Sequence, residues 1–579
     1  MCVRASAFVP REILGGLGAP EPRQAAMPFA SALRRRKTLS QFAAEALEEQ
    51  EESKDSLQLG LFDLLCIGIG GTVGSGVFVL TGEVLPVAGA ASALCWLFGG
   101  FVCLLSALSY MELSTVLQTR GSTYAFASYA LGEVAAVAGA ASLTLEYGLS
   151  GAGVARSWSA KLQGLVGGSW MYSSLRGDAV DVGGGGFFFD YAALCIQVAC
   201  VVVVAGGASV STKVINVFTV AKVALVVFMI VAGFYAGSAS TFAATPFLEK
   251  GVTGITTGTS LVFFGFIGFD EVVCMAARAK NPKKAMPRAI AGTLAGAAAL
   301  SFLAQLSLSW LYRADDGFSG ASFERGFHQR GLGAAKWLTE VGEVVLLPLV
   351  VLLSFLPQPE LVAAMGHDGL VPRAFARRTR VNGADVFGFG CFWTGAALSL
   401  VALVVPFNVL WNTINLGVLF GFNLTNASLI SVRAGNGGAL RDGKADTSLA
   451  ALCCVWLPAA AYVLWKGFAA PRLDGRAGRR DDVGYACLAV GACLAAQAYG
   501  SLRFLARRCK AVDDDDAGFR APFVPWLPGA AIFLNFALMA QYSAAEHVYF
   551  LGTRPESWSP GRATRQTELP RGRPQHSRF

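Results

Sequence analysis

The chain alternates between long apolar runs and short polar loops. From Leu61 to Tyr542, runs of about 20 apolar residues follow one another, and each is long enough to cross the hydrocarbon core of a bilayer as a helix. We count about thirteen such runs. Only 15% of the residues are charged, against roughly 25% in a typical soluble domain. The pattern therefore predicts an all-α polytopic membrane protein.

The polar loops indicate how the chain is oriented. Arginine and lysine gather in the loops that follow the even-numbered runs, and cytoplasmic loops of membrane proteins carry an excess of these residues. We therefore expect the N-terminus inside, although the loop Arg472–Arg480 would then lie outside. Residues 1–60 contain no apolar core before Leu57 of the kind that a secretory signal needs. We interpret them as a cytoplasmic tail, with an organelle transit peptide as the alternative.

Composition and side-chain chemistry exclude several classes of protein. The net charge of +8 comes from basic residues in the loops between apolar runs, so it does not indicate a nucleic-acid partner. No His/Cys cluster has the spacing of metal ligands, and no Ser/His/Asp set or soluble phosphate loop is present. Most of the 13 cysteines lie in apolar runs and resemble buried small hydrophobes. We expect neither an enzyme nor a cofactor.

The run Leu61–Leu80 contains the segment Gly68–Phe78, which has the sequence GIGGTVGSGVF. Glycine weakens a helix and lets backbone groups approach a ligand closely. Interrupted backbone at membrane depth is tolerated where it is buried in protein or lines a cavity. One hypothesis is a broken transmembrane helix that holds a small polar solute; the alternative is an unbroken helix with small residues at its packing face. A dinucleotide loop would require a preceding soluble strand, which is missing from the pattern.

A second apolar run, residues 254–277, favours the broken helix. Gly265 and Gly268 interrupt it, Asp270 follows, and it lies five runs after the first. Two glycine-interrupted helices at corresponding positions of two halves indicate inverted repeats with a binding site near the midplane. The start of the second half-helix, after Gly74, would offer free N–H groups to a carboxylate, and the end of the first, near Gly71, free carbonyls to an ammonium group. The pattern thus favours a zwitterion as the ligand.

Further charged residues lie inside apolar runs and need a partner or a function, because charge is costly in a bilayer. They are Glu146, Lys222 and Glu343. One interpretation is a structural ion pair between Glu146 and Lys222. The other is a proton site, in which the lysine ammonium takes the place of a coupling sodium ion. A cationic substrate would need an acceptor for its side-chain charge, and Glu271 and Glu343 are the candidates.

Five segments together resemble the cationic amino acid transporters of the amino acid–polyamine–organocation superfamily. They are GIGGTVGSGVFVLTGE, GAGVARSWSAKL, GFIGFDEVVCMAARAKNPKKAMPRAI, PQPELVAAMGHDGLVPRAF and APFVPWLPGAAIFLNFALM. The resemblance implies a LeuT-like fold of two inverted five-helix repeats with extra C-terminal helices. The implied organisation is a tail (1–60), a transporter core (61–432, repeats 61–236 and 254–432), peripheral helices (447–545) and a polar tail (546–579).

The resemblance also implies roles for individual residues. Gly74, Ser75 and Gly76 would hold the substrate carboxylate, and the carbonyls of Gly71, Thr72 and Val73 would hold the amino group. The segment Phe264, Gly265, Phe266 and Gly268 would close over the substrate. Coupling or gating would involve Glu146, Lys222 and Asp270, since Lys222 resembles the lysine of bacterial proton-coupled relatives.

The sequence departs from the family in three places. Ala277 and Arg278 replace the paired glutamates that usually precede the KNP segment, and Glu343 and Pro348 stand where small or hydroxyl residues are usual. A fourteenth run is missing from the C-terminal region. The altered residues leave a non-transporting amino acid sensor on the same scaffold as an alternative, and a polyamine carrier as another.

Taken together, these features predict a secondary transporter of α-amino acids, with arginine, lysine and ornithine as candidate substrates and protons as candidate coupling ions. Its partners would be the amino acid and membrane lipids. A plasma membrane and a vacuolar-type membrane both fit the prediction. Oligomeric state does not follow from the pattern.

Overall fold

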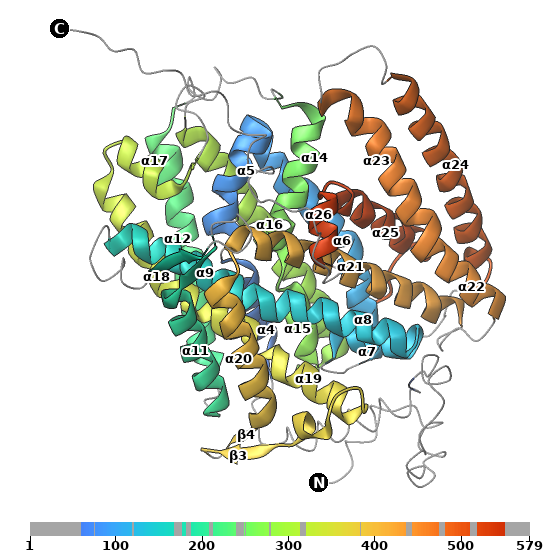
Figure 1. Ribbon diagram of the computed structural model, residues 1–579, viewed down its shortest axis with the longest axis horizontal. Helices are drawn as coiled ribbons and strands as arrows, with labels where there is room; N and C mark the ends of the chain where they lie inside the picture. The colour runs from blue at the N-terminus through green and yellow to red at the C-terminus, as the bar shows by residue number, and fades with distance from the viewer. Residues whose placement is uncertain are drawn as a thin grey trace.

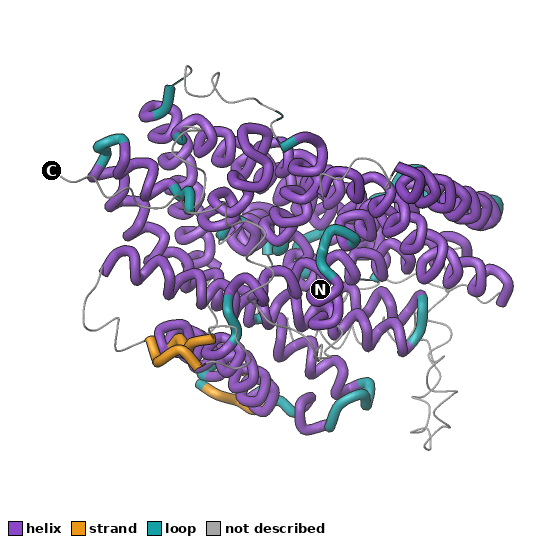
Figure 2. Tube along the Cα trace, turned by 45° about the horizontal axis from the view of Figure 1, so that its top comes forward, coloured by secondary structure: helices purple, strands orange, loops and turns teal. Residues whose placement is uncertain are grey.

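Helices make up nearly all of the described chain, as the apolar runs predict (Figure 2). The computed structural model describes residues 37, 59–74, 76–117, 121–166, 176–180, 187–207, 212–238, 248, 250–276, 279–312, 320–382, 384–435, 443–473, 481–509 and 518–550. Eight of the described helices are long and apolar enough to cross a membrane, and three shorter apolar helices accompany them. The prediction of an all-α polytopic membrane protein is confirmed; the number of spans stays a prediction.

The first half of the chain is interrupted early, at the glycine-rich segment. Its elements are α4 (Leu61–Thr72), η1 (Gly76–Leu80), α5 (Thr81–Ala88), η2 (Gly89–Ala91), α6 (Ser92–Val116), α7 (Ser122–Ala130), α8 (Glu133–Leu143), η3 (Thr144–Leu149), α9 (Ser150–Val166), β1 (Arg176–Val180), β2 (Phe187–Asp190), α11 (Tyr191–Ala205) and α12 (Thr212–Ala236).

The second half begins with another interrupted helix. Its elements are α14 (Gly251–Val262), η4 (Phe263–Phe266), α15 (Phe269–Cys274), α16 (Pro282–Leu311), α17 (Phe323–Gln329), α18 (Gly333–Phe355), α19 (Pro357–His367), η7 (Arg373–Ala376), β3 (Thr379–Val381), β4 (Ala384–Val386), α20 (Gly388–Val404) and α21 (Phe407–Ala434). After these come α22 (Gly443–Ala451), η8 (Leu452–Trp456), α23 (Leu457–Leu473), α24 (Asp481–Ala506), α25 (Trp526–Met539) and α26 (Ala544–Phe550).

Elements at corresponding positions of the two halves pack against each other. The first interrupted helix contacts the second, through α4 with α15 and η1 with η4. In the same way α6 contacts α16, α9 contacts α18, and α11 contacts α20. Such pairing of counterparts is what an internal two-fold relation produces, so it agrees with the expected inverted repeats. The boundaries of those repeats stay a prediction.

The interrupted helices lie inside the bundle, whereas the last long helices lie at its edge. The most apolar window of α21 is 83% buried and that of α24 is 17% buried, so α24 has little protein around it. Figure 1 shows α23 and α24 along one side of the molecule. It also shows α5 and α17 at one end, and α19 with β3 and β4 at the opposite end (Figure 1). Both two-stranded sheets are antiparallel and pair strands next to each other in sequence.

Candidate functional site

The first interruption lies between α4 and η1. The helix α4 ends at Thr72, whose hydroxyl donates a hydrogen bond to the Gly68 carbonyl at 2.7 Å. Val73 is extended (φ −81°, ψ 97°), which stops the helical ladder. The chain resumes as η1, where the N–H groups of Val77 and Phe78 both donate to the Gly74 carbonyl. The end of one half-helix and the start of the next therefore meet inside the bundle, as the glycine content predicts.

The second interruption lies between η4 and α15. Here Ile267 is extended (φ −62°, ψ 136°), and Gly268 has φ 124°, a conformation that side chains with a Cβ rarely adopt. A Cβ at Gly268 would lie 2.7 Å from the Thr72 nitrogen. Likewise, a Cβ at Gly76 would lie 2.6 Å from the Gly265 Cα. Glycine is thus required where the two interruptions touch, because the backbones approach too closely for any larger residue.

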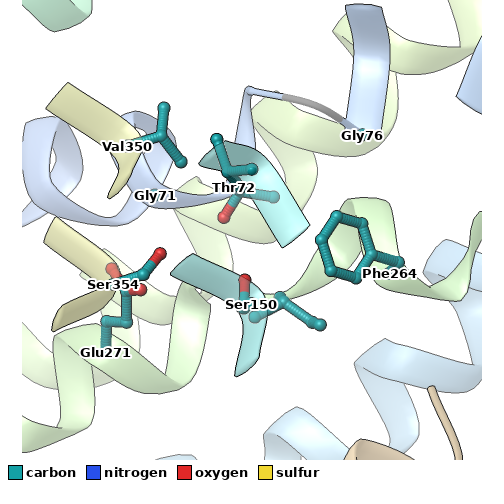
Figure 3. A pocket seen from close by; sticks show the side chains of 10 residues that line it. Gly71, Thr72, Gly76, Ser150, Phe264, Glu271, Val350 and Ser354 are labelled. Atoms are coloured by element: carbon teal, nitrogen blue, oxygen red, sulfur yellow. The ribbon is translucent and has the colours of Figure 1, made fainter. Parts of the chain in front are cut away.

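A narrow cavity of about 270 Å³ lies where the two interruptions meet (Figure 3). The interrupted helices contribute Gly71, Thr72, Gly76, Phe264, Ile267 and Glu271. Two continuous helices complete the wall, with Ser150 and Val154 from α9 and Val350 and Ser354 from α18. Both hydroxyl and carboxylate groups therefore face the cavity.

The predicted binding residues divide into two groups in the structure. Gly71, Thr72, Gly76 and Phe264 line the cavity. Val73, Gly74, Gly265, Phe266 and Gly268 belong to the same interruptions and lie next to the lining residues. The Phe266 ring packs on Trp96, with 5.7 Å between ring centroids, and thereby joins η4 to α6. Ser75 lies outside the described residues, as do Ala277 and Arg278.

Lys222 and Glu271 approach the end of α4 from different helices. Lys222 of α12 is fully buried, and its Nζ donates to the Gly70 carbonyl at 2.6 Å. The Glu271 carboxylate lies so close to Gly71 that an added Cβ there would collide with it. Figure 3 shows Glu271 extending toward the interruption, on the opposite side of the cavity from Phe264. The charges of Lys222 and Glu271 are close enough to attract each other. The Lys222 amino group therefore lies beside the C-terminal end of α4, and the Glu271 carboxylate faces the cavity.

Glu146 and Asp270 form a second buried acidic pair, behind the cavity. Asp270 accepts hydrogen bonds from the Tyr147 hydroxyl and from the Gly268 N–H, the latter at 3.2 Å. The Glu146 carboxylate faces Asp270, and neither of its oxygens has a hydrogen-bond partner among the described residues. The ion pair between Glu146 and Lys222, one of the two interpretations of the sequence, is not one of the contacts found in the described part of the chain. Two buried carboxylates without a donor between them can be held together by a shared proton.

Sequence reasoning places the site between four apolar runs, two of which are 134–154 and 335–356, but it named none of the residues that line the cavity from these two runs. Ser150 and Val154 lie on α9, and Val350 and Ser354 lie on α18. A weak signal existed, since Ser150 and Val154 are four residues apart, as are Val350 and Ser354, so each pair shares one helix face. Other faces of the same helices carry similar residues, and the pattern alone could not select between them. Glu271 was a candidate for a substrate charge, and the structure places it in the wall.

The comparisons with known proteins agree with this geometry. A family profile described as amino acid permease matches residues 59–474, and one described as the C-terminus of amino acid permease matches residues 519–551. Cationic amino acid transporter 4 of Mus musculus is 31% identical over 66% of this chain and 61% of its own length. The methylthioribose transporter of Bacillus subtilis is 30% identical over 67% of this chain and 84% of its own. The branched-chain amino acid permease BcaP of Bacillus subtilis is 29% identical over 69% of this chain and 85% of its own length. The aligned part of this chain thus spans about three fifths of the mouse relative.

Proposed function

We propose that this chain, which belongs to the amino acid permease family, is a secondary transporter that moves α-amino acids across a membrane by alternating access. The observation that carries the proposal is the cavity between two interrupted helices, lined by backbone ends and by Glu271. Membership of a family of transporters agrees with the expectation that the chain is not an enzyme. A plasma membrane or a vacuolar-type membrane is the proposed location.

In this proposal the two ends of the first interruption bind the two charges of one amino acid. The helix η1 begins at Gly76, and in this proposal the N–H groups of Gly74, Ser75 and Gly76, together with the helix dipole, bind the carboxylate. The carbonyls of Gly71, Thr72 and Val73 end α4 and favour the ammonium group. Glu271 adds a negative charge to this side of the cavity. The zwitterion would therefore lie along the interruption, with its ammonium group toward Glu271.

The second interruption is the proposed lid over the substrate. Phe264 already faces the cavity, while Gly265 and Phe266 lie against Trp96 of α6. Gly268 is the proposed hinge, because its backbone conformation is open to glycine and strained for other residues. A rotation of η4 about this point would move Phe264 toward or away from the solute.

Selectivity for cationic amino acids is a finer proposal that rests on Glu271. The relatives include transporters whose names specify cationic amino acids, branched-chain amino acids and methylthioribose, so family membership leaves the substrate open. A carboxylate in the wall of a small cavity would favour a substrate with an additional positive charge, because opposite charges attract more strongly where little water screens them. Arginine, lysine and ornithine are the proposed substrates.

Proton coupling is the proposed energy source, and two buried groups support it. The Lys222 ammonium bonds the Gly70 carbonyl, so loss of its proton would release the end of α4. The carboxylates of Glu146 and Asp270 face each other and could exchange a shared proton. Among the described residues, the ionisable side chains that interact electrostatically with these groups include Glu271, Tyr110, Tyr147, Cys103 and Cys274.

Uptake by proteoliposomes that contain the purified protein tests the transport proposal. The panel is radiolabelled arginine, lysine, alanine, glutamate and putrescine, each at two pH values. We expect saturable uptake of at least one α-amino acid and competition by free lysine but not by lysine with a blocked α-carboxyl group. Binding without flux would instead support a sensor, and uptake of putrescine insensitive to free lysine would support a polyamine carrier.

A separate measurement tests proton coupling. Lys222→Ala should abolish the stimulation of uptake by an inward proton gradient, because it removes the group that responds to the proton. Lys250→Ala is a matched control, since Lys250 lies just before α14 and outside the cavity wall. Uptake that is unaffected by the gradient and by Lys222→Ala would refute the coupling proposal while leaving the transport proposal intact.

A further inference from the structure

A buried group of three ionisable side chains, one lysine and two glutamates, lies apart from the cavity and has no role in the mechanism above. The Nζ atom of Lys161, on α9, lies 2.7 Å from the Glu343 Oε2 on α18. It also forms an ion pair with Glu324 of α17 and donates to the Phe78 carbonyl of η1 at 3.2 Å. One ammonium group thus joins four separate elements. We name Lys161, Glu324 and Glu343 the ionic cluster.

The ionic cluster lies on the same helix faces as the cavity wall. On α9, Ser150, Val154 and Lys161 are separated by four and seven residues, spacings that place them on one face. On α18, Val350 and Glu343 are likewise seven residues apart. Seven residues of α-helix span about 10 Å, so the cluster lies about 10 Å from the cavity along both helices. On α9 the cluster residue lies C-terminal to the cavity residues, and on α18 it lies N-terminal to them. The two helices run in opposite directions here, so both place the cluster at the same end of the cavity.

That end is the one that carries α17 and α5 (Figure 1). The third lining element also reaches the cluster, since Gly76 faces the cavity and Phe78, two residues later in η1, accepts from Lys161. Three elements of the cavity wall therefore meet again at one ammonium group, and α17 adds Glu324 from beyond them. With the predicted orientation of the N-terminus inside, this is the outer end.

Burial and charge indicate a contact that can open rather than a permanent stabilising one. The Glu343 side chain is fully buried and those of Lys161 and Glu324 are 16% and 10% exposed. A buried ion pair gains little net stability, because removing the ions from water costs about as much as their attraction returns. If the elements separate and water enters, the ions regain their hydration. Separation is therefore far less costly for this cluster than for an apolar contact of the same size.

We propose that the ionic cluster of Lys161, Glu324 and Glu343 is the outer gate of the cavity, where Lys161 holds η1 and α17 to α9 and α18. Opening the cavity to the outside breaks these contacts together. The role of the cluster as a gate rests on the proposed transport function, but the experiment that tests it does not require transport. Lys161 is a positioning residue here, because it acts on the cavity through η1 and α18.

A reporter cysteine measures opening without reference to any substrate. Ser157 of α9 lies between Val154 and Lys161 in sequence, is buried, and has no hydrogen-bond partner for its hydroxyl in the described part of the chain. Ser157→Cys replaces it with a side chain of similar size. The rate at which a membrane-impermeant maleimide modifies this cysteine in the full chain, reconstituted in vesicles, reports how often the outer end opens. The parent protein without the reporter gives the background from native cysteines.

Lys161→Met on this background should raise the labelling rate by roughly tenfold, a change of about 1.4 kcal/mol in the opening equilibrium. Glu324→Gln, which removes a single arm of the cluster, should raise it less. Lys336→Met is the matched control, because the ion pair of Lys336 is with Glu340 of the same helix and, among the described residues, it joins no second element. We expect Lys336→Met on the Ser157→Cys background to be labelled at the same rate as Ser157→Cys alone.

Equal labelling rates with and without Lys161→Met on the Ser157→Cys background would overturn the gate proposal, whether or not the protein transports amino acids. If Lys161→Met does not fold, as judged by size-exclusion chromatography, Glu324→Gln decides the question by the same criterion. If the gate is correct but the transport proposal fails, labelling still rises while amino acid uptake is absent. The two failures are therefore distinguishable.

Discussion

Two regions of this protein each bury a lysine among carboxylates, yet they use it differently. In the ionic cluster Lys161 contacts two carboxylates directly and has a carbonyl as a further acceptor. Beside the cavity Lys222 bonds a backbone carbonyl, while Glu146 has no hydrogen-bond partner among the described residues. Direct ion pairs join elements together. Carboxylates without a direct partner remain available to a substrate or a proton, so the comparison separates a gate from a binding and coupling centre.

The largest effect should come from the backbone on which the binding centre depends. Gly268→Ala puts a Cβ 2.7 Å from the Thr72 nitrogen at a backbone conformation of φ 124°, and such strain costs about 1–3 kcal/mol before the collision is counted. We expect loss of amino acid binding, measured by scintillation proximity with the purified protein.

Gly369→Ala is the control for that experiment. Gly369 also has positive φ, 78°, but no atom lies within 4 Å of an added Cβ. It therefore carries the strain without the collision and should retain binding. Equal loss in both variants would show that backbone strain, not contact between the two interruptions, explains the effect.

Glu271→Gln tests whether the binding centre selects positive charge. We expect uptake of lysine relative to alanine to fall by at least about tenfold, since hydrogen bonds to a charged group contribute roughly 1.5–3 kcal/mol. Glu324→Gln removes a carboxylate of the ionic cluster and should leave the lysine-to-alanine ratio unchanged. A ratio that responds to Glu324 and not to Glu271 would reverse the roles that we assign to the two regions.

The pH dependence of uptake should come from the binding centre and not from Glu324 of the ionic cluster. Burial opposes the charged form of Glu324, but the nearby Lys161 and several hydrogen bonds outweigh it and lower the pKa of this carboxyl to about 2. A lowered pKa means that the pair with Lys161 is fully formed above the ordinary value of about 4.3 and is lost as pH falls toward about 2. The charge of Glu324 is therefore constant between about pH 5 and about pH 8.

Uptake measured across that range should thus have the same shape in the parent and in Glu324→Gln. Glu146→Gln should flatten the profile, because it removes one of the two facing carboxylates. An altered profile in Glu324→Gln would place a titrating group in the gate.

The smallest effect is expected for an ion pair that joins no elements. Lys336 and Glu340 lie one turn apart on α18 at 3.4 Å, and the lysine is 36% exposed. Surface pairs of this kind contribute about 0–1 kcal/mol. Lys336→Met should therefore leave both the melting temperature and uptake close to the parent values. A large loss of stability or uptake in Lys336→Met would contradict the view that, at this end of α18, only ion pairs that join separate elements matter.

Sequence reasoning recovered the interruptions but only part of the site around them. Glycines around Thr72 and Phe266 predicted two broken helices, and both are broken there. The partners of the buried charges were not predictable in the same way. One of the two interpretations paired Lys222 with Glu146, whereas the Lys222 Nζ donates to the Gly70 carbonyl in the structure. The helix α12 is apolar on every side, so periodicity could not show which direction Lys222 faces.

The sequence by itself determined the membrane-spanning character and the places where two helices break, because both depend on the local solvation and backbone preferences of neighbouring residues. The tertiary structure decided which charges meet. Lys161 and Glu324 are 163 residues apart in sequence, and the packing of α9, α17 and α18 brings them together. A buried charge takes whichever partner the surrounding helices place within reach, so its role as a gate or as a binding group is a property of the packed bundle.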